Sequence, residues 1–137
     1  MTEVLAHRRF PAQSSELQAM RKDLRTILIK QVADQKLLDK IILAITEACS
    51  NIIQHAYGNN FNGDIILETM LEDQELVFRL IDFAPIVDKS KWQPRDLNDL
   101  RPGGLGVYFI QSVMDDCRFL EPEDGIGNIL ELRVNKG

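Results

Sequence analysis

Residues 37–55, LLDKIILAITEACSNIIQH, decide the fold of this chain. Aliphatic side chains recur at helical spacing from Leu38 to Ile53 and gather on one wide sector of a helical wheel. The opposite sector carries polar side chains, Glu47, Ser50, Asn51 and Gln54. The stretch therefore predicts an amphipathic helix that covers a hydrophobic core with one face and presents polar groups on the other.

Shorter segments on both sides predict the remaining elements. Ser15 and Gln18 resemble a capping box ahead of a first helix over residues 15–31, and Leu5, His7 and Phe10 predict a short edge strand that ends near a proline. Further strands are expected over residues 65–71, 76–81, 117–120 and 129–134, with a third helix from residue 106 to 114. This order predicts an α/β two-layer sandwich, with a mixed, mostly antiparallel sheet and its helices on one face.

Length and composition indicate one ordinary globular domain over residues 1–137. Hydrophobic residues make up 45% and charged residues 27% of the chain, which excludes a disordered class. The longest aliphatic run, residues 41–45, is far shorter than the roughly 20 residues of a membrane-spanning helix. The charged first residues do not resemble a secretory signal. We therefore expect a cytoplasmic protein without a membrane segment.

Cysteine, histidine and net charge narrow the classes of partner. Cys49 lies among the aliphatic positions and Cys117 is far away, so we expect no disulfide. His7 and His55 have no zinc-ligand spacing to the cysteines. Sixteen basic and twenty-one acidic residues give a net charge of −5, which disfavours direct binding to nucleic acid or anionic lipid. Protein or small-molecule partners fit better.

The polar face of the long helix carries two candidate site residues. Such faces often only contact solvent, and this interpretation stays open. However, Asn51 is a poor helix former in the middle of a helix. An Asn oxygen is a suitable Mg²⁺ ligand, and a carboxylate one turn away, Glu47, can accept a proton from a hydroxyl that attacks phosphorus.

A glycine cluster, residues 101–106 (RPGGLG), precedes the third helix. Glycines at a helix start leave backbone N–H groups accessible to a phosphate, although they also occur simply where a loop enters a helix. Arg101 adds a positive charge. The cluster lacks the Lys-Ser/Thr ending of a P-loop and does not lie in a dinucleotide-binding βαβ unit. With the polar helix face, it predicts a Mg-nucleotide site of another kind.

Together these motifs resemble a known superfamily. Glu47-Ala48-Cys49-Ser50-Asn51 with His55, then Asp82, then residues 101–106 are similar to the N, G1 and G2 boxes of the GHKL ATPases, whose shared ATP site is the Bergerat fold. Residues 100–110, followed by Met114-Asp115, resemble the glycine box and helix of the serine-kinase branch that contains bacterial anti-sigma factors. The resemblance covers nearly the whole chain.

At the phosphate end of the site, the resemblance implies that Asn51 ligates Mg²⁺ and that Glu47 orients or deprotonates the acceptor serine. Arg101 would contact the terminal phosphate from a long loop, residues 83–102, that acts as a lid. The phosphate-binding backbone would come from the same box, Gly103, Gly104, Leu105 and Gly106.

At the base end, the resemblance implies that Asp82 receives the adenine amino group. Asp82 could instead be a strand-end acid that binds nearby backbone amides, and this interpretation stays open. The family's adenine box runs Asp-x-Gly-x-Gly, whereas this chain has Ala84 and Ile86 at the glycine positions. Ala84 is small enough to lie under a purine ring. His55 contacts the nucleotide or is a structural residue near the helix end; both interpretations stay open.

The leading hypothesis is an ATP- and Mg²⁺-dependent protein serine kinase in a partner-switching circuit. By resemblance, its partners would be a STAS-domain antagonist that it phosphorylates, a sigma factor or another regulator, and a second copy of itself. The alternative is a noncatalytic binding switch of the same fold with a degenerate nucleotide site, motivated by Ala84 and Ile86. A third hypothesis is an interaction domain that binds no nucleotide.

Overall fold

The computed structural model describes residues 1–57, 63–85, 104–125 and 127–137. The strands are β1 (Thr2–Pro11), β2 (Asp64–Glu72), β3 (Glu75–Asp82), β4 (Asp116–Leu120) and β5 (Asn128–Asn135). The helices are α1 (Leu17–Leu28), α2 (Gln35–Asn51) and α3 (Gly104–Val113), with a 3₁₀ turn, η1 (Ser14–Glu16), and a π-helical segment, η2 (Ile52–Ala56).

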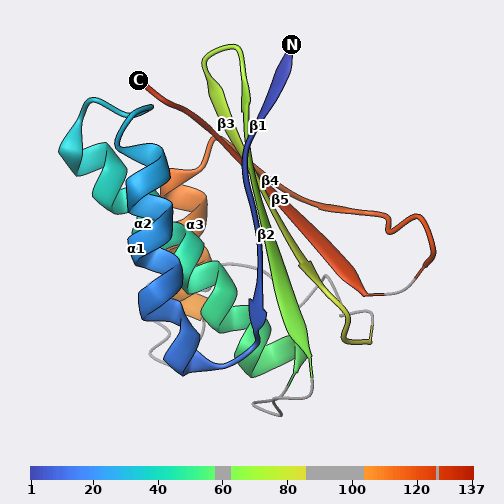
Figure 1. The fold of residues 1–137 in the computed structure, drawn as a ribbon. Helices are drawn as coiled ribbons and strands as arrows, with labels where there is room; N and C mark the ends of the chain where they lie inside the picture. The colour runs from blue at the N-terminus through green and yellow to red at the C-terminus, as the bar shows by residue number, and fades with distance from the viewer. Residues whose placement is uncertain (58–62, 86–103, 126) are drawn as a thin grey trace.

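The molecule has two layers. In the described part of the chain, five strands form a sheet in the order β1-β2-β3-β5-β4, and three helices lie on one face of it (Figure 1). The predicted two-layer α/β sandwich is confirmed. Each of the four described strand pairs is antiparallel, so the parallel component of the expected mixed sheet is not found among the described strands.

Two local predictions need correction. The edge strand β1 extends from Thr2 to Pro11 and is longer than expected, because it pairs with β2 along this whole length, across a register shift between Val4 and Ala6. The predicted capping box at Ser15 is wrong: the chain enters α1 through the 3₁₀ turn, and the N-cap residue of α1 makes no side-chain hydrogen bond to the helix. Side-chain capping occurs instead at α2, where Asp34 accepts a hydrogen bond from the Lys36 amide at 2.9 Å.

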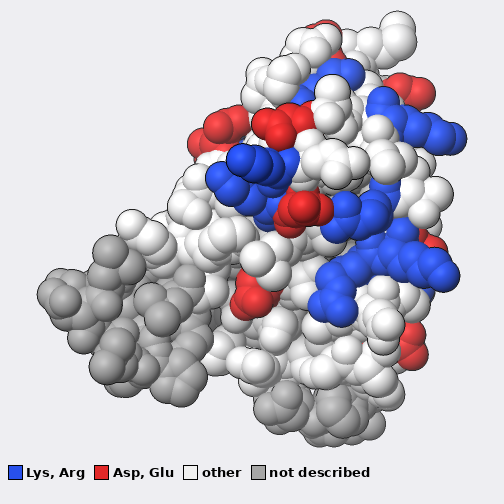
Figure 2. Space-filling view, turned by 90° about the vertical axis from the view of Figure 1, so that its left-hand side faces the viewer, with Lys and Arg blue, Asp and Glu red and all other residues white. Residues whose placement is uncertain are grey.

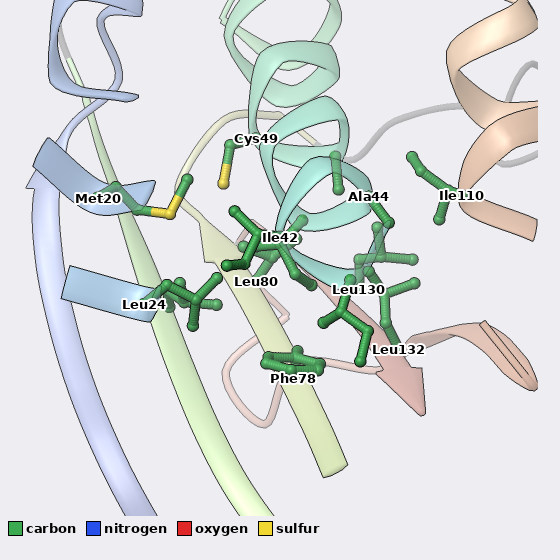
Figure 3. Close-up of a cluster of buried hydrophobic side chains, with 14 of the residues drawn as sticks. Met20, Leu24, Ile42, Ala44, Cys49, Phe78, Leu80, Ile110, Leu130 and Leu132 are labelled. Atoms are coloured by element: carbon green, nitrogen blue, oxygen red, sulfur yellow. The ribbon is translucent and has the colours of Figure 1, made fainter. Parts of the chain in front are cut away.

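Helix α2 is the centre of the core. Its aliphatic face packs between α1, α3 and the sheet, as the labelled side chains of Figure 3 show. Ile42 and Ala44 of α2 lie against this core with exposed fractions of 3% and 0%, and Phe78 of β3 is fully buried below them. Burying one large aliphatic or aromatic side chain contributes about 1.5–3 kcal/mol. The position of α2 is therefore strongly determined by packing.

The sheet face opposite the helices is covered by its own long charged side chains. Glu131 of β5, only 3% exposed, accepts hydrogen bonds from Arg79 of β3 at 2.9 Å and from Arg133 at 2.8 Å. The register places Arg79 directly opposite Glu131. Val77, on the same face, is fully buried. A central ion-pair network thus shields apolar atoms on the face that has no helices.

The helical face carries charges of both signs, which Figure 2 shows side by side. Arg25 of α1 pairs with Asp39 of α2 at 2.9 Å, and Arg8 of β1 pairs with Asp23 of α1. Mixed charges of this kind do not create a field of one sign on this face. Within the described ranges, no helix combines the length and apolar character needed to cross a bilayer.

Candidate nucleotide site

The polar face of α2 meets the start of α3. A Cβ atom added to Gly106 of α3 would lie 3.1 Å from Oε2 of Glu47, 3.8 Å from Oδ1 of Asn51 and 3.9 Å from Nδ2 of Asn51. Residues separated by more than fifty positions in the chain thus come into contact because α2 and α3 pack together. A side chain at this position would press on the Glu47 carboxylate and occupy the space between the α3 backbone and these two side chains.

Asn51 has an unusual environment for an amide side chain. It is 8% exposed, and its buried Nδ2 atom has no hydrogen-bond partner among the described residues. A buried polar atom without a partner is costly, by about 1–3 kcal/mol, unless a ligand or water supplies one. Rotation of the side-chain amide by about 180° exchanges the positions of Oδ1 and Nδ2, so Asn51 can offer either an oxygen ligand or an N–H donor at this point.

The end of α2 changes geometry at this point. After Asn51 the helix continues as the π-helical segment η2, in which the Tyr57 N–H donates to the Ile52 carbonyl at 3.1 Å. Single π-helical turns within helices occur frequently at functional sites. His55 lies in this segment with an exposed side chain. Its contact with a nucleotide stays a prediction.

The second group of site residues lies where β3 ends. Asp82 is 2% exposed, and Oδ1 accepts hydrogen bonds from the Ala84 amide at 3.1 Å and from Nδ2 of Asn128 at 2.9 Å. Burial raises the pKa of Asp82 above its usual value, although both hydrogen bonds oppose this shift. Ala84 is 4% exposed, so its methyl group is buried beside this carboxyl.

The sequence prediction missed Asn128. This residue pairs with Asp82 across β3 and β5, and its Nδ2 also donates to the Pro85 carbonyl at 3.2 Å. Gly127 brings it there: this glycine has φ +79°, and a Cβ on it would lie 2.1 Å from the Asp82 carbonyl oxygen. The turn glycines before the last strand were visible in the sequence, but the register that places Asn128 beside Asp82 was not.

Tyr57 was also missed. Its hydroxyl donates to the Asp64 carbonyl at 2.7 Å and accepts from the Phe83 amide at 2.8 Å. It therefore connects the end of the helix that carries Glu47 and Asn51 to the strand end that carries Asp82. The predicted site residues Arg101 and Gly103 lie outside the described residues, as does most of the predicted lid. Gly104 begins α3; Leu105 follows in that helix, and its side chain is likewise outside the description.

Both cysteines are free thiols, and neither belongs to the site. Burial raises the pKa of Cys49 to about 12, so this thiol stays neutral within the core face of α2. Among the described residues, no group of three or more His, Cys, Asp or Glu side chains has the arrangement of a metal site. A metal here would need ligands from a bound phosphate in addition to Asn51.

Comparison with known proteins identifies the family of this chain. The profile of the histidine kinase-like ATPase domain family matches residues 10–134. The chain belongs to this family. The predicted membership in the GHKL superfamily, in the branch of serine kinases and anti-sigma factors, is confirmed by its relatives.

Two relatives and one solved structure illustrate the similarity. The serine-protein kinase RsbW of Listeria monocytogenes is 25% identical over 134 residues, covering 92% of this chain and 85% of that protein. The serine-protein kinase RsbW of Bacillus cereus is 34% identical over 95 residues, covering 63% of this chain and 58% of that one. The crystal structure of the RsbU and RsbW domains of Rv1364c from Mycobacterium tuberculosis has a TM-score of 0.64 at 18% identity, covering 95% of this chain and 32% of that chain. This last similarity shows a shared fold.

Proposed function

We propose that this histidine kinase-like ATPase domain is an ATP- and Mg²⁺-dependent protein serine kinase of the partner-switching type, which phosphorylates a STAS-domain antagonist. The observation that carries the proposal is the close approach of Glu47 and Asn51 to the backbone of Gly106, where Nδ2 of Asn51 has no hydrogen-bond partner among the described residues. The serine-protein kinase names of its relatives support the same reaction class.

The residues fit the group they would hold. Asn51 offers a neutral oxygen of the kind Mg²⁺ binds, and α3 begins with the glycine-rich backbone that suits a phosphate. When bound, Mg-ATP supplies the phosphoryl group that is transferred. Glu47 is half-buried beside Gly106, where its carboxylate can orient the acceptor serine and take its proton.

Asp82 would hold the base. Both of its described hydrogen bonds are to Oδ1, and we propose that Oδ2 accepts the adenine amino group. Burial beside Ala84 and Asn128 keeps this carboxyl in one orientation. We propose that Arg101 contacts the terminal phosphate, and that a STAS protein, a sigma factor or another regulator, and a second copy of the chain are its partners.

Thermal shift is the first test. Saturating Mg-ATP should stabilise the protein, by about 2.7 kcal/mol when the ligand is at 100 times its Kd. Transfer from labelled ATP to a STAS-domain protein should follow, and Glu47→Gln should abolish transfer while retaining the thermal shift. Asn51→Ala should reduce the Mg²⁺-dependent part of that shift. Glu3→Gln, at an exposed position of β1, is the matched control that should change neither result.

The two competing hypotheses give different results. Tight partner binding without label transfer would identify a noncatalytic switch, in agreement with Ala84 and Ile86 in the adenine box. An unchanged melting temperature at saturating Mg-ATP would contradict nucleotide binding altogether.

A further inference from the structure

The Tyr57 hydroxyl lies where the next backbone pair of the β2–β3 ladder would form. Ile65 pairs with Asp82 in this antiparallel register, so Asp64 and Phe83 would form the next pair. Instead, the Tyr57 hydroxyl lies between them: it accepts from the Phe83 amide at 2.8 Å and donates to the Asp64 carbonyl at 2.7 Å. The hydroxyl thereby ends the ladder and determines how far Phe83 separates from β2.

The backbone at Phe83 controls the Asp82 carboxyl. Asp82 precedes Phe83, and the Ala84 amide that follows donates to Oδ1 of Asp82 at 3.1 Å. The conformation of these three residues is therefore coupled to one amide hydrogen bond, the one made by Tyr57. Nδ2 of Asn128 donates a second hydrogen bond to the same Oδ1 atom of Asp82, at 2.9 Å.

The surroundings of Tyr57 allow little movement. A Cβ on Gly63 would lie 2.4 Å from Cε1 of the Tyr57 ring, so this glycine leaves the space that the ring fills. On the other side, the Arg9 guanidinium lies 5.1 Å from the centre of the Phe83 ring, and its Nε pairs with Asp64 at 2.7 Å. Asp64 and Phe83 thus meet at the Tyr57 hydroxyl, and Arg9 of β1 contacts both of these residues.

We propose that Tyr57 is a positioning residue for base recognition: its hydroxyl holds the Phe83 amide so that Asp82 selects a 6-amino purine over a 6-oxo purine. This inference rests on the proposed function, because it concerns the base of the same nucleotide. Tyr57 does not touch the base; it acts through the backbone that carries Asp82. Because the helix bearing Glu47 and Asn51 leads into Tyr57, the same residue also connects the base end of the site to its phosphate end.

Nucleotide selectivity of Tyr57→Phe tests this role. Dissociation constants for Mg-ATP and Mg-ITP, which differ at the 6-position of the purine, are measured by calorimetry for wild type, Tyr57→Phe and Tyr108→Phe. Tyr108 lies on α3 and is 43% exposed. Tyr108→Phe is therefore the matched control, because it also removes one tyrosine hydroxyl. Loss of one hydrogen bond that orients the carboxylate should reduce the preference for ATP over ITP about fivefold in Tyr57→Phe. Tyr108→Phe should keep the wild-type preference.

The outcomes separate this inference from the proposed function. If wild type prefers ATP and Tyr57→Phe weakens both nucleotides equally, Tyr57 has only a structural role and the inference is wrong, while the kinase proposal stands. If wild type binds neither nucleotide, the proposed function fails, and this inference with it.

A second measurement applies if Tyr57→Phe does not fold. In wild type, the Phe83 amide should exchange its hydrogen slowly although the residue is 43% exposed, and Mg-ATP should slow it further. Exchange at the rate of a free amide, with or without Mg-ATP, would contradict the inference.

Discussion

Replacing Asn128 with alanine removes the side-chain donor nearest to the buried Asp82 carboxyl. The Nδ2 atom lies 2.9 Å from Oδ1 of Asp82, and the residue is 6% exposed, so water does not readily take its place. A hydrogen bond to a charged group contributes about 1.5–3 kcal/mol. At roughly 3 °C per kcal/mol for a chain of this size, the melting temperature should fall by about 6 °C at neutral pH.

The stability lost on replacing Asn128 with alanine should decrease as the pH falls. Burial already raises the pKa of Asp82, and the Asn128 hydrogen bond opposes that shift, so the variant should have a higher Asp82 pKa than wild type. Above both pKa values the carboxylate is charged in both proteins, and the difference in unfolding free energy is largest. As the pH falls through these raised values, the carboxyl becomes neutral in both folded proteins and the difference shrinks.

Urea denaturation at neutral and acidic pH measures this difference. Asp82→Asn is the matched background, because its uncharged amide oxygen still accepts from Asn128 while the charge is absent. In that background the cost of Asn128→Ala should be smaller and independent of pH, which a double-mutant cycle shows directly. An equal loss at both pH values, or the same loss in both backgrounds, would refute the reasoning.

Two further predictions concern the start of α3 and the sheet network. Gly106→Ala should leave the melting temperature without ligand unchanged or higher, since alanine is more favourable than glycine in a helix by up to about 1 kcal/mol. The added Cβ beside Glu47 should nevertheless reduce the thermal shift that Mg-ATP produces. A thermal shift equal to that of wild type would contradict the proposed site. Glu131→Gln should lower the unfolding free energy measured in urea by about 1–2 kcal/mol, because it removes the charge that pairs with Arg79 and Arg133, while Arg133 keeps its contact with Glu75. Burial opposes ionisation of Glu131, but the arginine hydrogen bonds outweigh it and lower its pKa, so this contribution should be present above the usual carboxyl pKa and disappear as the pH falls through the lowered value. Glu3→Gln, at an exposed position, should show neither effect, and equal results for the two variants would contradict a role for the network.

Periodicity predicted the elements well because packing and pattern agree. The aliphatic face of α2 is buried as its helical spacing indicated, and the alternating residues of β3 divide between the helices and the opposite face. The misses are local. The length of β1 depends on a bulge and on pairing with β2, and neither leaves a clear signal within ten residues of sequence.

The candidate site likewise contains residues that the sequence predicted and residues that it missed. Glu47, Asn51, Asp82 and the glycines were predicted because each belongs to a motif with a fixed spacing. The contacts of Asn128 and Tyr57 depend on strand register and on the π-helical turn, so they become visible only when the chain is folded. Residues that orient a functional group are generally harder to find from one sequence than the group itself.

The two faces of α2 have a consequence for how such a domain can diverge. Its aliphatic face packs in the hydrophobic core, whereas Glu47 and Asn51 lie on its polar face beside Gly106. Substitutions on the polar side could therefore silence the chemistry and leave the shape that a partner protein recognises. A lineage of this architecture can pass from enzyme to pure binding protein, or return, through very few changes along a single helix.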